Sequence, residues 1–222
     1  MIFGKITYLN LLPFHAFMKR YLRHSGEKGA WVRRGGVPSR INRDFRLGRI
    51  DAAVISSIRS RRCRCADLGI VADGEVMSVL ALPGRSRPDG ASETSNALAR
   101  VLGVEGEVVI GDRALALYFD KNRMHPVTDL AAVWKRRYGL PFVFARLCAS
   151  PRYGRRIDRI AHLFHAKRVR VPYVVRRKEA ARHGLTVREL DLYLSKIYYR
   201  IGWREKRGLA LFWKKAARLS KF

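Results

Sequence analysis

Short apolar runs rich in β-branched residues alternate along the chain with longer stretches whose apolar residues recur at helical spacing. Residues 2–9 predict a strand and residues 11–21 predict a helix, so that Asn10 lies at the junction between them. An asparagine in this place can cap the helix with its side-chain oxygen, and Pro13 suits a first helical turn. Ligands of open α/β sheets also bind just beyond the carboxyl ends of strands. Asn10 therefore has two interpretations, a helix cap or a ligand contact.

The same alternation continues to the end of the chain. Further strands are expected in residues 30–32, 50–55, 68–72, 76–82, 106–110 and 140–148. Further helices are expected in residues 37–48, 91–102, 113–119, 127–138, 157–164, 186–201 and 209–219, with Asp112 and Thr128 as caps of two of them. Strands that alternate with helices indicate an α/β fold with mainly parallel sheets.

Two features divide this pattern into two lobes. Residues 84–90 are rich in turn formers and predict a crossing into a second lobe, and the apolar strand near Phe142 predicts the return. The expected lobes are residues 1–83 together with 144–222, and residues 84–143. A ligand cleft would then lie between the lobes.

Small polar side chains stand where the first lobe would face such a cleft. Ser56 and Ser57 follow the strand in residues 50–55, and Ser78 is the only polar side chain in the strand of residues 76–82. Each hydroxyl could contact a ligand, or could instead cap a turn or satisfy a buried backbone group.

The opposite wall of the cleft would come from the second lobe. Thr94 and Ser95 precede an apolar helix, and Asp112 begins another. Hydroxyls and free N–H groups at a helix N-terminus can hold a carboxylate, although they can also act as caps alone. With Asn10 and the serines of the first lobe, these residues predict a hydroxyl-lined pocket that suits a carboxylate ligand.

Net charge adds a rival hypothesis. The 46 lysines and arginines against 18 acidic residues leave a charge of +28, which predicts attraction to polyanions at low salt. Residues 146–222 hold 22 of the basic residues and 5 of the acidic ones, so this part could form a nucleic-acid or membrane-surface patch. Against that, the basic residues are spread over helices with apolar faces, and no known RNA- or DNA-binding motif occurs.

The cysteines and the hydropathy indicate where the protein works. Cys63, Cys65 and Cys148 form an odd set without a disulfide pattern, which is typical of a reducing compartment. No further Cys/His pair follows at zinc-like spacing, so no metal is expected. No apolar run is long enough to cross a membrane, and the first residues do not resemble a secretion signal. We therefore expect a cytoplasmic protein.

Six segments, taken together, resemble one family. They are GKITYLNLLPF (residues 4–14), IDAAVISS (50–57), GEVMSV (74–79), ETS (93–95), VIGDRAL (109–115), and Trp134 with GLPFVF (139–144). In this order they are similar to the chorismate dehydratases of the futalosine route to menaquinone. The resemblance covers residues 4–148 and is weakest over the C-terminal part. The segment that typically opens the pathway's sister enzyme, which makes dihydroxynaphthoate, does not occur.

The resemblance implies a two-lobed, type 2 periplasmic-binding-protein-like fold with its active site in the cleft. It implies that chorismate, a dicarboxylate, loses water in the cytoplasm without a cofactor to give 3-[(1-carboxyvinyl)oxy]benzoate. We expect a monomer or a homodimer. Asn10 and Ser78 match the family's active-site Asn and Ser. The pairs Ser56-Ser57 and Thr94-Ser95 match positions where this fold usually binds ligand carboxylates.

The residue types limit the chemistry that such an enzyme could use. An amide is essentially non-basic, so we expect Asn10 to orient the leaving hydroxyl or the enolpyruvyl group while a carboxylate of the substrate accepts the proton. His15 is an alternative base, and Arg113 and Arg146 are the arginines nearest the motifs. Two other functions stay open, a non-catalytic carboxylate-binding protein of the same fold and a basic polyanion-binding or nucleic-acid-binding protein.

Overall fold

The computed structural model describes residues 1–22, 24–120, 122, 125–167 and 169–219. Its helices are α1 (Leu12–Tyr21), α2 (Ser25–Arg33), α3 (Pro38–Arg46), α4 (Glu93–Leu102), α5 (Gly111–Phe119), α6 (Leu130–Tyr138), α7 (Gly154–Ala166), α8 (Tyr173–Arg182), α9 (Val187–Ser195) and α10 (Trp203–Leu219), with the short 3-10 helices η1 (Leu9–Leu11), η2 (Ser60–Arg62) and η3 (Pro151–Tyr153). Its strands are β1 (Lys5–Ile6), β2 (Gly35–Gly36), β3 (Ala52–Ser56), β4 (Arg64–Ala72), β5 (Val79–Leu82), β6 (Glu107–Ile110), β7 (Thr128–Asp129), β8 (Phe142–Ala149) and β9 (Tyr198–Arg200).

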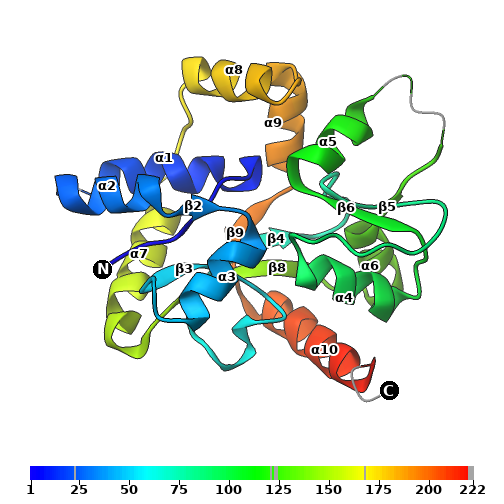
Figure 1. Ribbon diagram of the computed structural model, residues 1–222, viewed down its shortest axis with the longest axis horizontal. Coiled ribbons are helices and arrows are strands. Elements are labelled where there is room, and N and C mark those ends of the chain that lie inside the picture. Colours follow the sequence, from blue (N-terminus) through cyan, green and yellow to red (C-terminus); the bar gives the residue numbers. More distant parts are fainter. Residues whose placement is uncertain (23, 121, 123–124, 168, 220–222) are drawn as a thin grey trace.

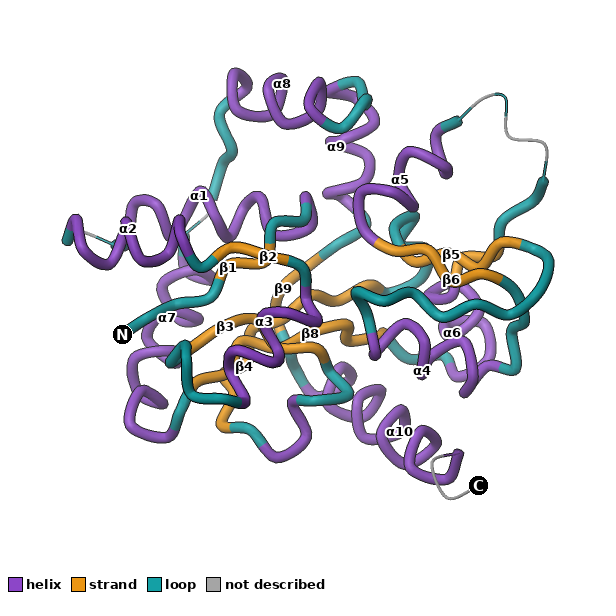
Figure 2. The backbone as a smooth tube through the Cα atoms, in the orientation of Figure 1, coloured by secondary structure: helices purple, strands orange, loops and turns teal. Residues whose placement is uncertain are grey.

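The expected α/β fold with two lobes is confirmed (Figure 1). A four-stranded sheet in the order β3-β8-β4-β9 is the centre of one lobe, and a three-stranded sheet in the order β6-β5-β7 is the centre of the other. In Figure 2 the smaller sheet lies to one side with α4, α5 and α6, while α1, α2, α3 and α7 lie on the side of the larger sheet.

The expectation of mainly parallel sheets is wrong. Strand β8 pairs antiparallel with both β3 and β4, and β5 pairs antiparallel with β6 and β7. The reason is the path of the chain. Strands β3 and β4 both run toward the second lobe, and β8 returns from that lobe between them in the opposite direction. Among the named strands of the described residues, β1 and β2 form the parallel pair.

The chain crosses between the lobes earlier than expected. Strand β5 already belongs to the smaller sheet, and the Arg87 N–H donates to the Gly106 carbonyl oxygen at 3.1 Å, so residues 84–90 lie inside the second lobe. We therefore propose crossings at residues 73–78 and 139–141, in place of boundaries at 83 and 143.

Several short elements differ from the sequence pattern. Residues 30–32 lie in helix α2, where Trp31 is the buried side chain, because three residues cannot distinguish a strand from a helical turn. The helix expected over residues 186–201 ends at Ser195, since residues 198–200 pair with β4. Helix α8 buries mainly Ala180, so it offered no apolar stripe to detect.

Aromatic side chains form a core where the two lobes meet. Trp134 of α6 lies 5.2 Å from Phe142 of β8 and 6.3 Å from Phe212 of α10, measured between ring centroids. Burial of such a side chain is worth about 1.5–3 kcal/mol, so this cluster stabilises the return crossing. The helix of residues 154–166 covers the larger sheet with the predicted stripe of Ile157, Ile160, Ala161 and Phe164.

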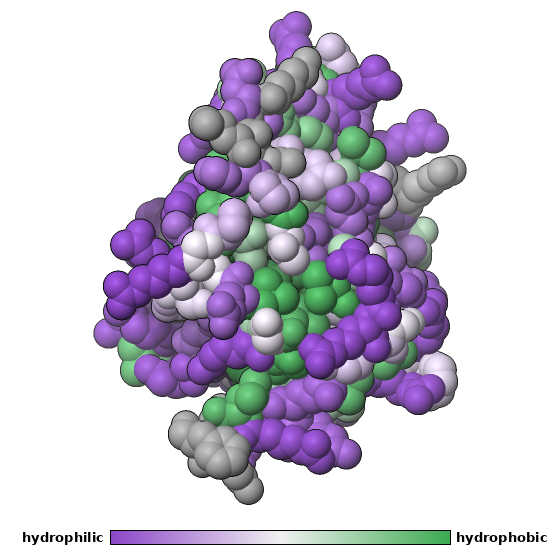
Figure 3. All heavy atoms as spheres, turned by 90° about the vertical axis from the view of Figure 1, so that its right-hand side faces the viewer, coloured by the Kyte–Doolittle hydropathy of each residue, from purple (hydrophilic) through white to green (hydrophobic). Residues whose placement is uncertain are grey.

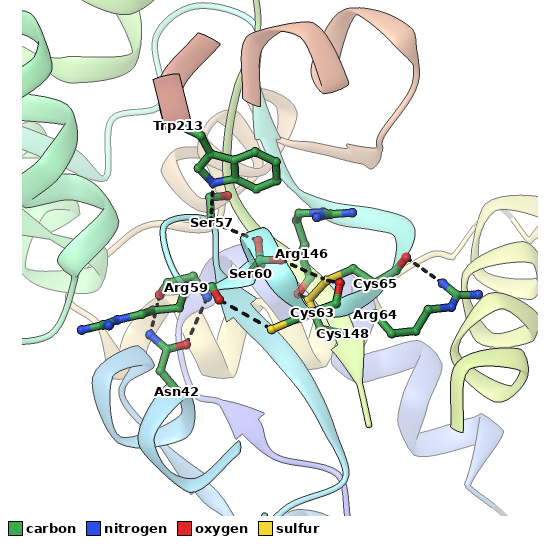
Figure 4. Close-up of a disulfide and its surroundings, with 11 residues drawn as sticks. Asn42, Ser57, Arg59, Ser60, Cys63, Arg64, Cys65, Arg146, Cys148 and Trp213 are labelled. Carbon is green, nitrogen blue, oxygen red and sulfur yellow. Dashed lines mark hydrogen bonds between the residues drawn. A yellow bond between two sulfur atoms is a disulfide. The ribbon is translucent and has the colours of Figure 1, made fainter. Parts of the chain in front are cut away.

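A disulfide joins β4 to β8, contrary to the expectation from the cysteine count. Cys65 and Cys148 are 83 residues apart in sequence but occupy opposite positions in the antiparallel register (Figure 4). Sequence spacing could not show this pairing, because it depends on where β8 returns. Cys63 is a free thiol of intermediate exposure. No helix in the described ranges is long and apolar enough to span a membrane.

Candidate active site

A small cavity of about 50 Å³ lies between the lobes, and we call it the central cavity. Its described lining residues include four of the predicted ones, Asn10, Ser56, Ser78 and Ser95. Ser57, Thr94 and Asp112 are not among them. The residues predicted for the site therefore fall into two groups, those that face the cavity and those that lie outside it.

Asn10 lies in η1 and caps no helix. Neither η1 nor α1 has a side-chain cap, so the interpretation of Asn10 as a cap is wrong. Its backbone carbonyl accepts a hydrogen bond of 2.7 Å from the Tyr199 hydroxyl. Its side-chain Oδ1 is buried and finds no hydrogen-bond partner among the described residues. An unsatisfied buried acceptor in a cavity wall is a position that a ligand donor would fill.

Ser78 lies just before strand β5 and is held by a bent backbone. The residue before it, Met77, has a φ of 62°, a left-handed conformation that non-glycine residues adopt only when their surroundings enforce it. Asp129 enforces it, because its Oδ2 accepts the N–H groups of Val76 at 2.9 Å and Met77 at 2.7 Å. Asp129, and not the predicted Thr128, is also the cap of α6.

The Ser78 side chain contacts a buried tyrosine from the C-terminal part of the chain. The Tyr193 hydroxyl donates to Ser78 Oγ at 3.0 Å. The Asn10 side chain acts on the same hydroxyl and opposes the rise of the pKa of Tyr193. Burial raises the pKa of Tyr193, so its phenol stays protonated. Helix α9, which carries it, begins with a capping box of Thr186 and Glu189.

Two further cavity serines, Ser56 and Ser95, likewise accept hydrogen bonds from the protein. Asn42 Nδ2 donates to Ser56 Oγ at 2.8 Å, and the Ser92 hydroxyl donates to Ser95 Oγ at 2.9 Å. Because a serine hydroxyl has one hydrogen to donate, each of these residues can still donate it into the cavity. Ser92, directly before Glu93, is the cap of α4 that the sequence analysis missed.

Helix N-termini supply the remaining polarity of the central cavity. Helix α4 begins beside it at Ser92 and α5 begins beside it at Gly111. Such ends carry partial positive charge and free N–H groups, which favour anions. Tyr8 also lines the cavity, and burial, followed by the charges of Asp89 and Asp112, raises the pKa of Tyr8 to about 12. None of the described lining residues is a lysine, arginine, histidine or carboxylate.

The three predicted residues outside the cavity bind other parts of the protein. The Ser57 hydroxyl donates to the Val143 carbonyl at 2.5 Å, and Thr94 Oγ1 accepts the Ile58 N–H at 3.2 Å. Ser57 is further fixed through its carbonyl, which accepts from Trp213 Nε1 at 2.8 Å (Figure 4).

Asp112 lies in the first turn of α5 and is not its cap, which corrects the prediction. It links the lobes instead, because its Oδ1 accepts the Leu9 N–H at 3.3 Å and its Oδ2 lies 3.1 Å from His183 Nε2. Burial raises the pKa of Asp112, and His183 opposes that shift.

The alternative base and the arginines nearest the motifs are not among the described residues that line the cavity. The His15 ring lies edge-on to Trp31 at 5.5 Å, and burial, reinforced by Lys5, lowers the pKa of His15 to about 3. The Arg146 guanidinium lies over the Trp213 ring at 5.9 Å, and Arg113 is exposed.

Comparisons with known proteins agree on one family. Residues 92–218 match a family model described as menaquinone biosynthesis. The chain is 41% identical over 216 residues to a chorismate dehydratase of Campylobacter jejuni, with 96% of each chain covered.

Two solved structures are more distant. Protein AF1704 from Archaeoglobus fulgidus has a TM-score of 0.67 at 14% identity, covering 99% of this chain and 97% of that one, which shows a shared fold. The aliphatic sulphonate binding protein SsuA of Escherichia coli has a TM-score of 0.48 at 11% identity, covering 100% and 87%, and we draw nothing from it. The family model spans more than half of the chain and the dehydratase nearly all of it, so the chain belongs to the menaquinone biosynthesis family that includes this chorismate dehydratase.

Proposed function

We propose that this chain is a chorismate dehydratase, which removes water from chorismate to give 3-[(1-carboxyvinyl)oxy]benzoate. The observation that carries the proposal is the 41% identity to a chorismate dehydratase over 96% of the chain. The polarity of the central cavity supports it. Three serine hydroxyls that accept from the protein can donate inward, and two helix N-termini favour anions, so the cavity suits a dicarboxylate.

In the proposed reaction a ring C–H bond and the neighbouring C–O bond break, and the electron pair completes an aromatic ring. Aromatisation supplies the driving force, so the protein has to orient the substrate and exclude solvent. The described lining residues offer no side chain that is a base near neutral pH, because Tyr8 is a neutral phenol and Asn10 is an amide. A carboxylate of the substrate therefore takes the ring proton and passes it to the leaving hydroxyl, which departs as water. Asn10 and Ser78 orient the reacting atoms.

Substrate binding requires the lobes to separate. The central cavity measures about 50 Å³, whereas ligand pockets usually measure roughly 300–1,000 Å³. In our proposal the crossings at residues 73–78 and 139–141 act as hinges, and the Asp112 contacts with Leu9 and His183 break and re-form across the cleft. Closure then removes water from around the reacting atoms.

We propose that the enzyme works as a monomer or a homodimer. We further propose that the enzyme works in the cytoplasm. There Cys65 and Cys148 would be thiols, because reducing compartments disfavour disulfides. Turnover should be equal with and without a thiol reductant, which a rate measurement under both conditions checks.

The direct test is to mix the purified protein with chorismate and to follow the rise of aromatic absorbance without added cofactor. Saturable chorismate binding without turnover would favour a non-catalytic binding protein. Nucleic-acid affinity that falls steeply with salt, again without turnover, would favour the polyanion hypothesis.

Variants then locate the site. We expect Asn10→Ala to lower kcat by about 100-fold, as the loss of one positioned polar group in a closed site often does, and Ser78→Ala to lower it by at least roughly tenfold. Ser57→Ala is the matched control. It removes a buried serine hydroxyl whose partner is the Val143 carbonyl, so it should cost about 1 kcal/mol of stability and leave kcat unchanged. If Ser57→Ala lowered kcat as much as Ser78→Ala, the assignment of the cavity would be wrong.

A further inference from the structure

Tyr193 joins the two residues that the proposed mechanism relies on. Tyr193 is 0% exposed in helix α9. Its hydroxyl donates to Ser78 Oγ, and the Asn10 side chain acts on the same hydroxyl. Ser78 is 115 residues away in sequence, and Asn10 lies near the start of the chain. The C-terminal part, where the sequence resemblance is weakest, therefore contacts the core of the candidate site.

The directions of these hydrogen bonds follow from counting hydrogens. A phenol has one hydrogen to donate, and Tyr193 donates it to Ser78 Oγ at 3.0 Å. The Asn10 side chain opposes the rise of the pKa of this phenol, as a hydrogen-bond donor does, so its amide N–H is the side that faces the phenol oxygen. As a result, Asn10 Oδ1 faces away from Tyr193, and within the described part of the chain it is buried without a partner.

Ser78 has the opposite role toward a ligand, that of a hydrogen-bond donor. Because Ser78 Oγ already accepts from Tyr193, its own hydrogen is available to donate into the cavity. One hydroxyl thus makes Asn10 a hydrogen-bond acceptor toward the ligand and Ser78 a donor toward it. Chorismate needs both, because its ring hydroxyl can donate and its carboxylates only accept.

We propose that Tyr193 is a positioning residue that fixes the hydrogen-bond polarity of Asn10 and Ser78, so that Asn10 Oδ1 accepts from the ring hydroxyl of chorismate and Ser78 donates to an acceptor oxygen of the same molecule. This inference rests on the proposed function. It also accounts for release of the product, which has lost that hydroxyl and leaves Asn10 Oδ1 unpaired again.

The test is a mutant cycle with Tyr193→Phe, which keeps the buried ring and removes the hydroxyl. We expect kcat to fall roughly 10- to 100-fold with KM changed less than about threefold, because orientation and not attraction is lost. The double variant Tyr193→Phe with Ser78→Ala should lose less activity than the product of the two single losses, since the two changes share the contact between Tyr193 and Ser78. Tyr198→Phe is the control, because the Tyr198 hydroxyl donates to Glu205 Oε1 at 2.7 Å and not to the site.

Two results would overturn the inference. One is a Tyr193→Phe enzyme as active as the parent while Asn10→Ala and Ser78→Ala are impaired. The other is effects of Tyr193→Phe and Ser78→Ala that simply multiply. If neither Asn10→Ala nor Ser78→Ala is impaired, the assigned site itself fails, which is a separate outcome.

A second variant keeps the test valid if Tyr193→Phe does not fold. Asn10→Asp has the same shape but cannot donate to Tyr193, so it should reverse the polarity and lower kcat as strongly as Asn10→Ala. An Asn10→Asp enzyme as active as the parent would contradict the proposal. Thermal unfolding of each variant confirms that the comparison is made on folded protein.

Discussion

The central cavity and a larger hollow at the surface, which we call the outer hollow, differ in the polar atoms that they offer a ligand. The outer hollow measures about 610 Å³ and lies between α4, residues 86–88 and the end of α10. Figure 3 shows an apolar hollow ringed by hydrophilic side chains on the face that carries these elements. Its polar groups are largely committed, since Arg59 pairs with Glu93 and Asn96 bonds to the backbone of Asp89. The central cavity is far smaller, yet it contains a buried acceptor that no described residue satisfies.

The difference shows that volume is a poor guide to the site of a closing enzyme. A cavity that an enzyme encloses between its lobes is small when the lobes are together, so its volume in the closed form does not reveal it. The central cavity is distinguished by polar side chains that are already oriented before a ligand binds. This arrangement leaves one buried acceptor, Asn10 Oδ1, without a partner among the described residues.

The largest effect that separates the two regions should come from Gly111→Ala. Gly111 has a φ of 62°, and an added Cβ would lie 2.9 Å from the Tyr8 ring across the cavity. The clash would keep the lobes apart, and kcat/KM should fall roughly 10- to 100-fold, the equivalent of about 1–3 kcal/mol of strain.

Gly103→Ala is its matched control, which is measured in the same steady-state assay. Gly103 has a φ of 63°, but no atom lies within 4 Å of an added Cβ. It should cost about 1 kcal/mol of stability and leave turnover intact. Equal losses of activity in both variants would mean that backbone strain, and not closure of the central cavity, is being measured.

The next largest effect should come from Asp129→Ala. This carboxylate accepts three backbone N–H groups, those of Val76, Met77 and Ala132. Its loss leaves them unpaired and should lower the free energy of unfolding by about 3 kcal/mol and kcat by roughly tenfold, because Ser78 loses the turn that holds it. Urea denaturation and steady-state kinetics measure the two effects. The adjacent Thr128→Ala should change neither by more than about 0.5 kcal/mol or twofold.

Part of the fold and of the candidate site could be predicted from the sequence alone. Strands such as β6 and β8 were predictable because each is a mainly apolar run with a single charged residue, and the α7 stripe was predictable because its spacing is helical. Asn10, Ser56, Ser78 and Ser95 could be chosen since strand and helix ends converge on clefts in α/β folds. What the pattern does not show is the direction of a side chain, and for this reason Ser57 and Thr94 were chosen with their neighbours.

Tyr193 could not have been chosen from the sequence. It belongs to an apolar helical stripe with Leu190 and Leu194, and only the fold brings its hydroxyl to Ser78. The Cys65–Cys148 bond and the antiparallel sheet share this cause, since both depend on where a strand returns after an excursion through the other lobe.

A smaller effect is expected at His15, where a substitution should change the pH dependence of stability but not the rate of turnover. The folded protein keeps this imidazole neutral down to about pH 3, while the unfolded chain protonates it below its ordinary pKa of 6.5. Stability from this group is complete above pH 6.5 and is lost as the pH falls toward 3. Between pH 7 and pH 5 the loss is about 2 kcal/mol.

His15→Gln keeps a side-chain N–H and should remove this part of the pH dependence, as urea denaturation at both pH values would show. Because His15 does not line the central cavity, turnover should stay within about twofold of the parent. A loss of turnover that follows the titration of His15 would instead make it the base, and would contradict a cavity that works with neutral groups.

The smallest effect is expected at the outer hollow, and it completes the comparison. Arg100 lines that hollow and is exposed, so Arg100→Glu reverses a charge there without opening a buried contact. If the hollow has no part in turnover, kcat/KM should stay within about twofold of the parent and stability within about 0.5 kcal/mol. A rise of KM by tenfold or more with kcat unchanged would show that the hollow attracts the dianionic substrate before the lobes close. The substrate would then bind first at the outer hollow and afterwards in the central cavity. The unsatisfied Asn10 Oδ1 would identify only the second of these two binding sites.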